Sequence, residues 1–214
     1  GPNGSGKSTF ARLIAGLAAP DGGDITLLGH RAYADALPNA DEYRAARRGI
    51  GVVFQNPEDQ LVTTVLEDDV AFGPENLGIE RSRIGERIDD SLKSVGLVSF
   101  RQSDPTRMSG GQQQRAAIAG MLAMSPAMLV LDEPTAMLDE SARAEVMRIL
   151  DDLQAQGTTI VHVTHHQDET VHADRIVHME SGQIVGIEAV SARPQTIANH
   201  PSPDEPHQPG RDVA

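Results

Sequence analysis

The chain has 214 residues, 39% of them hydrophobic but only 3% aromatic, so a single domain with an aliphatic core is expected. It contains no cysteine, which excludes disulfide bonds and thiolate-bound metals. The formal net charge of −13 disfavours a general nucleic-acid binder, because affinity for nucleic acid depends largely on positive side chains that neutralise phosphates.

The first part of the chain predicts a loop, a helix and two strands. A glycine-rich loop spans residues 1–9, and apolar side chains spaced three or four apart predict a helix over 10–17. Short apolar runs predict strands over 24–28 and 50–54, and the polar stretch 30–48 is interpreted as a loop with a short helix. A phosphate-binding loop normally follows a strand, and none precedes this one, so the chain is interpreted as a fragment.

The middle of the chain, residues 65–125, is expected to be helical. Apolar residues recur there at helical spacing, at Ile84, Ile88, Leu92 and Val95. Gly96 is placed to end that helix, and an alanine-rich helix is expected over 112–124. The block interrupts an alternation of strands and helices, so it is interpreted as a helical subdomain.

The last part returns to alternating elements. Strands are expected over 127–131 and 158–163, with a helix over 140–155 between them, and a hairpin over 176–179 and 184–185. The whole pattern predicts an α/β fold with a mostly parallel sheet.

Two units are expected from this pattern. A single domain is expected over residues 1–190, followed by a proline-rich, disordered tail over 191–214. The sequence shows no internal repeat.

The loop at the start carries the residues of a phosphate-binding site. Gly1, Gly6, Lys7 and Ser8 have the spacing G-x-x-x-x-G-K-S, which predicts backbone N–H groups around a phosphate at a helix N-terminus. Lys7 is expected to reach the β- and γ-phosphates, and the Ser8 hydroxyl to bind Mg²⁺. A glycine- and serine-rich loop with an incidental lysine is the simpler interpretation, but it leaves the full motif and the following helix unexplained.

The strand over 127–131 ends in two acidic residues, Asp132 and Glu133. Ligands bind at the carboxyl ends of strands in open α/β sheets, so Asp132 is expected to hold Mg²⁺ through water. Glu133 is expected to accept a proton from the attacking water or to orient that water. Acidic pairs after strands are common, so this motif alone does not decide the function.

Two further motifs are weaker when taken singly. Ser109-Gly110-Gly111-Gln112 precedes a helix, and both an anion site and a simple helix cap fit it. His165 follows the strand over 158–163, on the same expected edge as Glu133, and is predicted to contact a γ-phosphate. The neighbouring histidines suggest a metal site; they are His162, His166, His172 and His178. That site is disfavoured, because His162 and His166 straddle the end of the strand.

The order of these motifs resembles that of the ATP-binding cassette (ABC) family over nearly all of residues 1–185. The order is more specific than any one motif, and it implies a P-loop NTPase fold, ATP and Mg²⁺ as ligands, and ATP hydrolysis. The resemblance makes the first loop the Walker A motif, which consists of Gly1, Pro2, Asn3, Gly4, Ser5, Gly6, Lys7, Ser8 and Thr9.

The same resemblance assigns roles to the other motifs. Gln55 becomes a Q-loop glutamine that contacts Mg²⁺, Asp132 the Walker B aspartate, Glu133 the catalytic glutamate, and His165 the switch histidine. It also assigns nucleotide binding to the D-loop residue Asp139 and to the signature motif, which consists of Ser109, Gly110, Gly111 and Gln112. In this family the signature motif of one subunit caps the ATP on another, which implies a head-to-tail dimer with a second ABC ATPase, identical or different.

A narrower resemblance is carried by QNPEDQ at residues 55–60, by EDDVAFGPENLG at 67–78 and by AIAG at 117–120. These segments resemble the ATPases of energy-coupling factor transporters and of their cobalt and nickel relatives. The resemblance implies import of a vitamin or a transition-metal ion, with a transmembrane coupling protein and a membrane substrate-binding protein as partners. It places the chain on the cytoplasmic face of the membrane. No apolar run approaches the roughly 20 residues that span a bilayer, so those partners are expected to hold it there.

Three departures from the family pattern bear on these expectations. Met108 stands where the family usually has Leu, and Met137 where it often has Gly. The strand and the adenine-stacking aromatic residue that the family has upstream of the loop would precede Gly1. A chain that begins at Gly1 is expected to bind ATP poorly, and addition of the upstream strands is expected to restore ATPase activity.

Two alternative functions are kept. One is a soluble, non-transport ABC ATPase of DNA repair or translation, which the acidic charge disfavours; no nucleic-acid partner is expected. The other is an inactive or regulatory fragment of a transport ATPase, which the presence of Lys7, Glu133 and His165 disfavours.

Overall fold

The computed structural model describes residues 4–190. Gly1, Pro2 and Asn3 of the first loop, and the tail expected over 191–214, lie outside the described residues.

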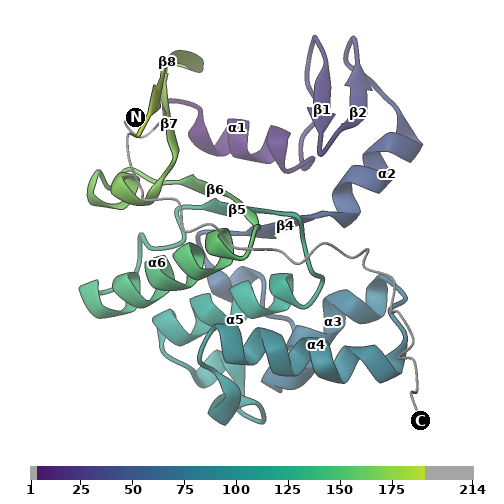
Figure 1. The fold of residues 1–214 in the computed structure, drawn as a ribbon, viewed down its shortest axis with the longest axis vertical. Coiled ribbons are helices and arrows are strands. Elements are labelled where there is room, and N and C mark those ends of the chain that lie inside the picture. The colour runs from purple at the N-terminus through teal and green to yellow at the C-terminus, as the bar shows by residue number, and fades with distance from the viewer. Residues whose placement is uncertain (1–3, 191–214) are drawn as a thin grey trace, which may run out of the picture.

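A three-stranded parallel sheet forms the centre of the fold (Figure 1). Its strands, in spatial order, are β4 (Ile50–Val53), β5 (Met128–Asp132) and β6 (Thr159–Val163). The central strand is buried on both faces, as expected for a parallel sheet, since Leu129, Val130 and Leu131 are at most 1% exposed. This confirms the expected α/β fold with a parallel sheet.

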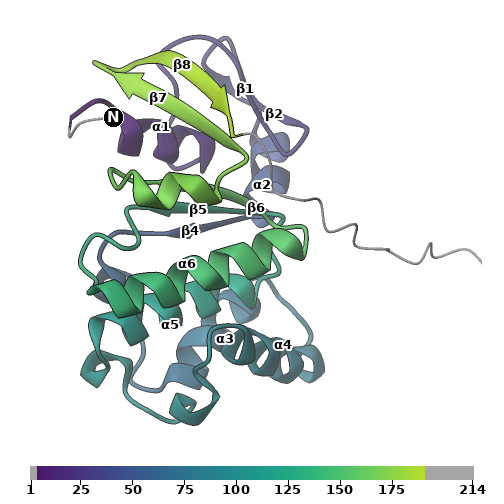
Figure 2. The ribbon, with the colours of Figure 1, turned by 60° about the vertical axis from the view of Figure 1, so that its left-hand side comes forward.

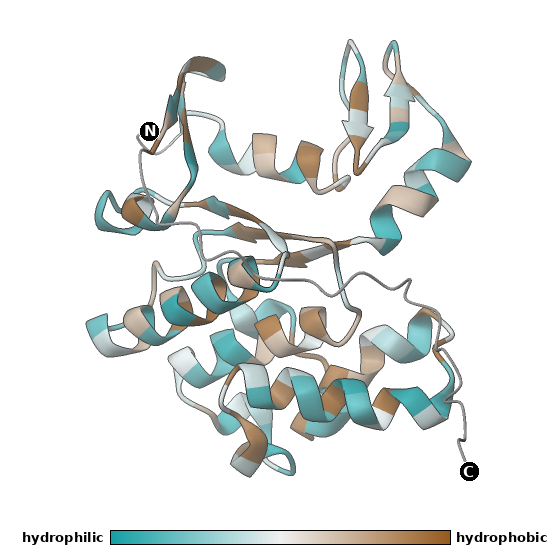
Figure 3. Ribbon diagram, viewed as in Figure 1, coloured by the Kyte–Doolittle hydropathy of each residue, from teal (hydrophilic) through white to brown (hydrophobic). Residues whose placement is uncertain are grey.

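Helices cover the two faces of this sheet. Figures 1 and 2 show α1 (Lys7–Ile14) on one side and α5 (Gly110–Leu122) and α6 (Glu140–Ala155) on the other. Side chains of β5 alternate between these layers, because Leu129 and Leu131 pack with the buried residues of α5 and α6, whereas Met128 and Val130 pack with those of α1. Figure 3 shows the central strands largely in the colour of hydrophobic residues.

The helical stretch expected over 65–125 contains three α-helices and short 3₁₀ turns. The helices are α3 (Leu66–Asn76), α4 (Arg81–Ser94) and α5; the turns between them are η2 (Val98–Phe100) and η3 (Pro105–Arg107), and η1 (Pro57–Asp59) precedes them. Gly96 follows α4 with φ +68°, and its N–H donates to the Lys93 carbonyl, so it ends the helix as predicted. Arg101 bridges two helices by pairing with Glu67 of α3 and Asp89 of α4.

The interpretation of residues 30–48 as a loop with a short helix was half wrong. The helix is α2 (Ala40–Arg48), but two strands precede it, β2 (His30–Ala34) and β3 (Leu37–Pro38), and they form an antiparallel sheet with β1 (Ile25–Leu27). The β1–β2 turn is a tight hairpin with positive φ at both central residues, Leu28 and Gly29. A Leu-Gly pair is not among the usual sequence signals of such a turn, so the sequence did not predict strand β2.

The predicted C-terminal hairpin is confirmed as β7 (Arg175–Glu180) and β8 (Gln183–Ala189). A short 3₁₀ helix, η4 (Asp168–His172), connects β6 to it. Among the helices of residues 4–190, none has the length and apolar character needed to cross a membrane.

Candidate functional site

The described part of the glycine-rich loop leads directly into α1. The helix begins at Lys7, three residues earlier than the helix expected over 10–17, because Gly6 takes the left-handed N-cap position at φ +95°. A Cβ atom on Gly6 would lie 3.2 Å from the Gly182 backbone, and the Gly182 N–H donates to the Ser5 carbonyl at 2.9 Å. The turn of the β7–β8 hairpin therefore packs against the loop.

This loop has the polar groups that a phosphate needs. Ser5 is 3% exposed, and its Oγ has no hydrogen-bond partner among the described residues. The first N–H groups of α1 have no partner within the helix, and the positive end of the helix dipole lies there. A buried, unused hydroxyl beside a helix N-terminus fits an anionic ligand.

Ser8 and Asp132 come from distant parts of the sequence but meet in the fold. The Ser8 Oγ donates to Asp132 Oδ1 at 3.0 Å, because Asp132 ends β5 on the face that α1 covers. Burial raises the pKa of Asp132, and the nearby Glu133 adds to the rise, whereas the hydrogen bond from Ser8 opposes it. A hydroxyl and a carboxylate are hard oxygen ligands, so the pair fits Mg²⁺, which proteins hold through one or two carboxylates together with substrate phosphates.

Glu133 and His165 lie at the ends of neighbouring strands. Glu133 directly follows β5, its N–H donates to the Val163 carbonyl at 2.9 Å, and its Oε2 lies 3.4 Å from His165 Nδ1. Glu133 has φ +49°, a left-handed conformation that is uncommon outside glycine and often marks functional sites. The parallel register, in which Asp132 pairs with Val163, brings the two side chains together.

Lys7 and Gln55 are placed beside this pair in different ways. Lys7 and His165 both line a cavity of about 1170 Å³ between α1, β6 and the β7–β8 hairpin. Gln55 is exposed and lies two residues after Val53. Val53 pairs with Leu131 in the sheet, and Glu133 lies two residues after Leu131, so Gln55 and Glu133 follow their strands at matching positions. All of these predicted residues thus gather at one edge of the sheet, at the carboxyl ends of its strands.

The Ser109–Gln112 turn is not brought to this edge within the chain. Ser109 and Gln112 form a capping box, in which the Gln112 N–H donates to Ser109 Oγ and the Ser109 N–H donates to Gln112 Oε1. The turn packs on the start of α6, where a Cβ on Gly111 would lie 2.7 Å from Ala142 Cβ, and Asp139 caps that helix by accepting from the Ala142 N–H. Figure 2 shows α5 on the opposite side of the sheet from α1.

A buried network beside Glu133 and His165 was missed by the sequence analysis. Glu169 is 4% exposed and accepts hydrogen bonds from Thr135 and Thr164, while His162 Nε2 lies 3.4 Å from its carboxylate. Glu169 lies in a polar 3₁₀ turn without hydrophobic periodicity, so the sequence carries no signal for its burial.

Within residues 4–190, no group of three or more potential metal ligands lies close enough to hold an ion. Three of the histidines that suggest a metal site in the sequence, His162, His172 and His178, each lie beside a different carboxylate. His172 Nδ1 lies 2.8 Å from Asp151, and His178 Nε2 lies 3.4 Å from Glu188.

The buried His162 predicts a pH dependence of stability. Burial lowers its pKa below the ordinary value of 6.5, although the charge of Glu169 opposes the shift. The unfolded chain therefore takes up this proton at a higher pH than the folded chain. The stability linked to neutral His162 is full above about pH 6.5, and it is lost as the pH falls from there through the lower pKa of His162 in the folded chain. Denaturant unfolding at pH 7.5 and 5.5 should show a smaller loss on acidification for His162→Gln than for the wild type. An equal loss in the two proteins would show that His162 does not contribute.

Comparison with known proteins identifies a family and several relatives. Residues 1–136 match the ABC transporter family. A protein of Bifidobacterium longum named as an ABC transporter ATP-binding protein, BL0043, is 80% identical over 205 residues, which are 96% of this chain and 26% of that protein. The energy-coupling factor transporter ATP-binding protein EcfA1 of Clostridium perfringens is 50% identical over 188 residues, 86% of this chain and 64% of that protein. The chain thus spans about a quarter of the first relative and just under two thirds of the second.

Two solved structures share the fold. CbiO1 from Clostridium perfringens, part of the ABC transporter complex CbiONQ, has a TM-score of 0.80 and 33% identity, with 89% of this chain and 75% of that chain covered. The ATP-binding cassette MJ0796, solved as a dimer bound to ADP and Pi, has a TM-score of 0.76 and 30% identity, with 90% and 84% covered. The chain, with its loop, strand-end carboxylates and histidine in this order, belongs to the ABC transporter family.

Proposed function

We propose that the chain binds and hydrolyses ATP, as the ATPase subunit of an importer of the energy-coupling factor type. One observation carries the ATPase proposal: the Glu133–His165 pair, 3.4 Å apart, lies at the same sheet edge as the Ser8–Asp132 pair, 3.0 Å apart. Phosphoryl transfer to water requires a general base, a histidine and oxygen ligands for Mg²⁺ beside a phosphate-binding loop, and these two pairs supply those groups.

Each residue has a separate task in this proposal. The loop N–H groups and Lys7 bind the phosphates, and Glu133 accepts a proton from the attacking water or orients it. His165, held beside Glu133, contacts the γ-phosphate. Ser8 and Asp132, with Gln55, would hold Mg²⁺, which neutralises negative charge on the phosphates when it is bound.

A second ATPase subunit, identical or different, completes the site in this proposal. The Ser109–Gln112 turn and Asp139 lie away from the loop of their own chain, yet the turn sits at the N-terminus of a 13-residue helix, where an anion is favoured. The related cassette MJ0796, dimeric with ADP and Pi, supports a nucleotide site that involves two copies. ATP that touches both subunits favours the closed dimer, because it binds that state more tightly.

The transport role rests on the segments 55–60 and 67–78 and on the relatives EcfA1 and CbiO1. The proposed cargo is a vitamin or a transition-metal ion such as cobalt or nickel, and the proposed partners are a transmembrane coupling protein and a membrane substrate-binding protein. The chain would then work at the cytoplasmic face of the membrane. Co-purification with a small polytopic membrane protein is expected, whereas a stable soluble complex with DNA or ribosomes would overturn this role.

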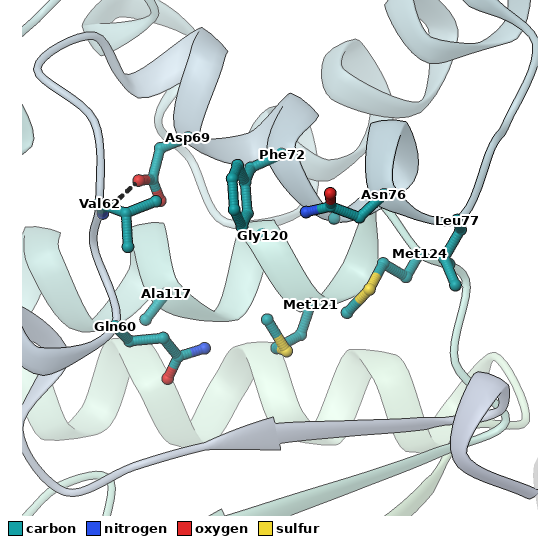
Figure 4. A pocket seen from close by; sticks show the side chains of 11 residues that line it. Gln60, Val62, Asp69, Phe72, Asn76, Leu77, Ala117, Gly120, Met121 and Met124 are labelled. Carbon is teal, nitrogen blue, oxygen red and sulfur yellow. Dashed lines mark hydrogen bonds between the residues drawn. The ribbon is translucent and has the colours of Figure 1, made fainter. Parts of the chain in front are cut away.

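An apolar groove offers a surface for the coupling protein. A pocket of about 300 Å³ lies between α3, α5 and the segment after η1, and Figure 4 shows the side chains that line it. Phe72, 51% exposed, lies over it, and Met121 and Met124 line it from α5. Flexible thioethers adapt to a partner's shape, and an exposed aromatic ring is a typical anchor.

The groove predicts a mutational effect on assembly. Phe72→Glu should reduce co-purification of the membrane partner by about tenfold or more, since a charge in an apolar contact loses the buried area and adds a desolvation cost. The matched control is Val98→Glu, because Val98 is 52% exposed but lies on η2 and does not line the groove. Equal recovery of the partner with both variants would rule out this groove as the contact.

A further inference from the structure

The Glu169 carboxylate, in η4, ties together two segments of the site. Its Oε1 accepts from Thr135 Oγ1 at 2.6 Å, and its Oε2 accepts from Thr164 Oγ1 at 2.5 Å. Glu169 is 4% exposed and Thr135 is 1% exposed, so water does not compete for these bonds. A buried carboxylate is costly unless its oxygens are bonded, so both contacts hold the side chain in one place.

The two threonines lie on either side of the reacting pair. Thr135 follows Glu133 by two residues, and Thr164 directly precedes His165. One Glu169 oxygen is thus bonded to the segment that carries Glu133, and the other is bonded to the segment that carries His165. The hydrogen bond from the Glu133 N–H to the Val163 carbonyl and the pairing of β5 with β6 also link the segments.

Basic side chains around Glu169 suit a buried carboxylate. The Arg143 Nε of α6 lies 3.9 Å from Oε1, and Arg143 also lies 3.6 Å from Asp168. His162 Nε2 of β6 lies 3.4 Å from Oε2. Arg143 offsets the negative charge of the carboxylate, and neither distance replaces the hydrogen bonds from the two threonines.

We propose that Glu169 is a positioning residue, which holds Glu133 and His165 at their working separation through Thr135 and Thr164. The proposal rests on the ATPase function proposed above. The Glu169 carboxylate is bonded to the segments that carry Glu133 and His165, so it is expected to act on the chemical step and not on ATP binding. A displacement of about 1 Å at a reacting group can cost about 10²-fold in rate.

The first test is Glu169→Gln in the intact protein. An amide keeps the shape but has one acceptor oxygen where the carboxylate has two, so one threonine hydroxyl loses its acceptor. We expect kcat to fall by about 10- to 100-fold, with the Kd for ATP within about twofold of the wild type. The matched control is Glu67→Gln, since Glu67 also accepts two side-chain hydrogen bonds, from Arg101 and Gln102, but lies in α3 away from the site. It should hydrolyse ATP like the wild type.

The second test uses Thr135, which leaves the buried carboxylate in place. Thr135→Val removes the hydroxyl and should lower kcat, whereas Thr135→Ser keeps the hydroxyl and should restore it. Because Thr135 and Glu169 act through one hydrogen bond, the double variant Thr135→Val/Glu169→Gln should lose much less than the product of the two single losses. Unchanged turnover in Glu169→Gln and Thr135→Val overturns the inference, as does a loss of ATP binding that parallels the loss of kcat. A wild-type protein without ATPase activity is a different result, since it removes the proposed function itself and the inference with it.

Discussion

Replacement of Glu133 by glutamine is expected to lower ATP turnover by about 10²–10⁴-fold, the usual contribution of a general base. The amide is nearly the same size as the carboxylate and can keep the 3.4 Å approach to His165 Nδ1, but it does not accept a proton. The loop, Lys7 and the Ser8–Asp132 pair are untouched, so ATP should still bind. Because hydrolysis no longer removes the γ-phosphate, closed dimers should accumulate with ATP, and size-exclusion chromatography with bound-nucleotide analysis measures both.

An exposed glutamate provides the control for this variant. Glu86 lies on α4, exposed and away from the sheet edge, so Glu86→Gln makes the same chemical change outside the site. It should hydrolyse ATP at the wild-type rate. Wild-type turnover in Glu133→Gln would mean that another group accepts the proton.

Replacement of Lys7 by alanine is expected to weaken ATP binding by roughly 10- to 100-fold. A hydrogen bond to a charged group contributes about 1.5–3 kcal/mol, and each 1.36 kcal/mol corresponds to a factor of ten. Lys7 is the first residue of α1 and lines the same cavity as His165, so its loss removes a positive charge from the phosphate side of the site. Titration with a fluorescent ATP analogue measures the Kd.

The chain offers a matched control for this change as well. Lys93 is the other lysine in the sequence, and it lies on α4 with its side chain 67% exposed, 3.9 Å from Asp90. Such a surface ion pair contributes little, so Lys93→Ala should leave both stability and ATP affinity close to those of the wild type. If the two alanine variants bind ATP equally well, Lys7 does not contact the nucleotide.

The sequence predicts most of the site because its residue types and spacings are local. Lys7 and Ser8 follow a glycine at a helix N-terminus. Asp132 and Glu133 come at the end of an apolar run, and that run predicts a buried strand. Their meeting depends only on a general property of parallel sheets, in which ligand-binding residues gather at the carboxyl ends of the strands. The distances between these residues could not be predicted from the sequence, because they depend on the register of β5 against β6, which brings His165 beside Glu133.

The residues that the sequence did not predict are those whose role depends on tertiary packing alone. Glu169 stands in a polar stretch that looks exposed, and it is buried because Thr135 and Thr164 come from segments 34 and 5 residues away. Gly182 contacts Ser5 from a turn that is distant in the sequence. Strand β2 has only five residues, and Ala32 and Tyr33 are buried through packing beneath α2, which no pattern in HRAYA reveals.

The two readings of the Ser109–Gln112 turn, a helix cap and an anion site, are compatible in the structure. The capping box uses the Ser109 side chain and the N–H groups of Ser109 and Gln112. The N–H groups of Gly110 and Gly111 lie in the first turn of α5, where a helix has no internal acceptor for them, so they are suited to the phosphate that the proposed second subunit would hold.

Phosphate release from ATP by the intact protein, in the presence of Mg²⁺, tests the central claim most directly. Wild type and Glu133→Gln are compared at equal bound ATP, so that a difference in release reports the chemical step alone. The proposed site predicts steady release by the wild type and release near background by Glu133→Gln. Equal release by the two proteins, or no release by a wild type that binds ATP, would contradict it.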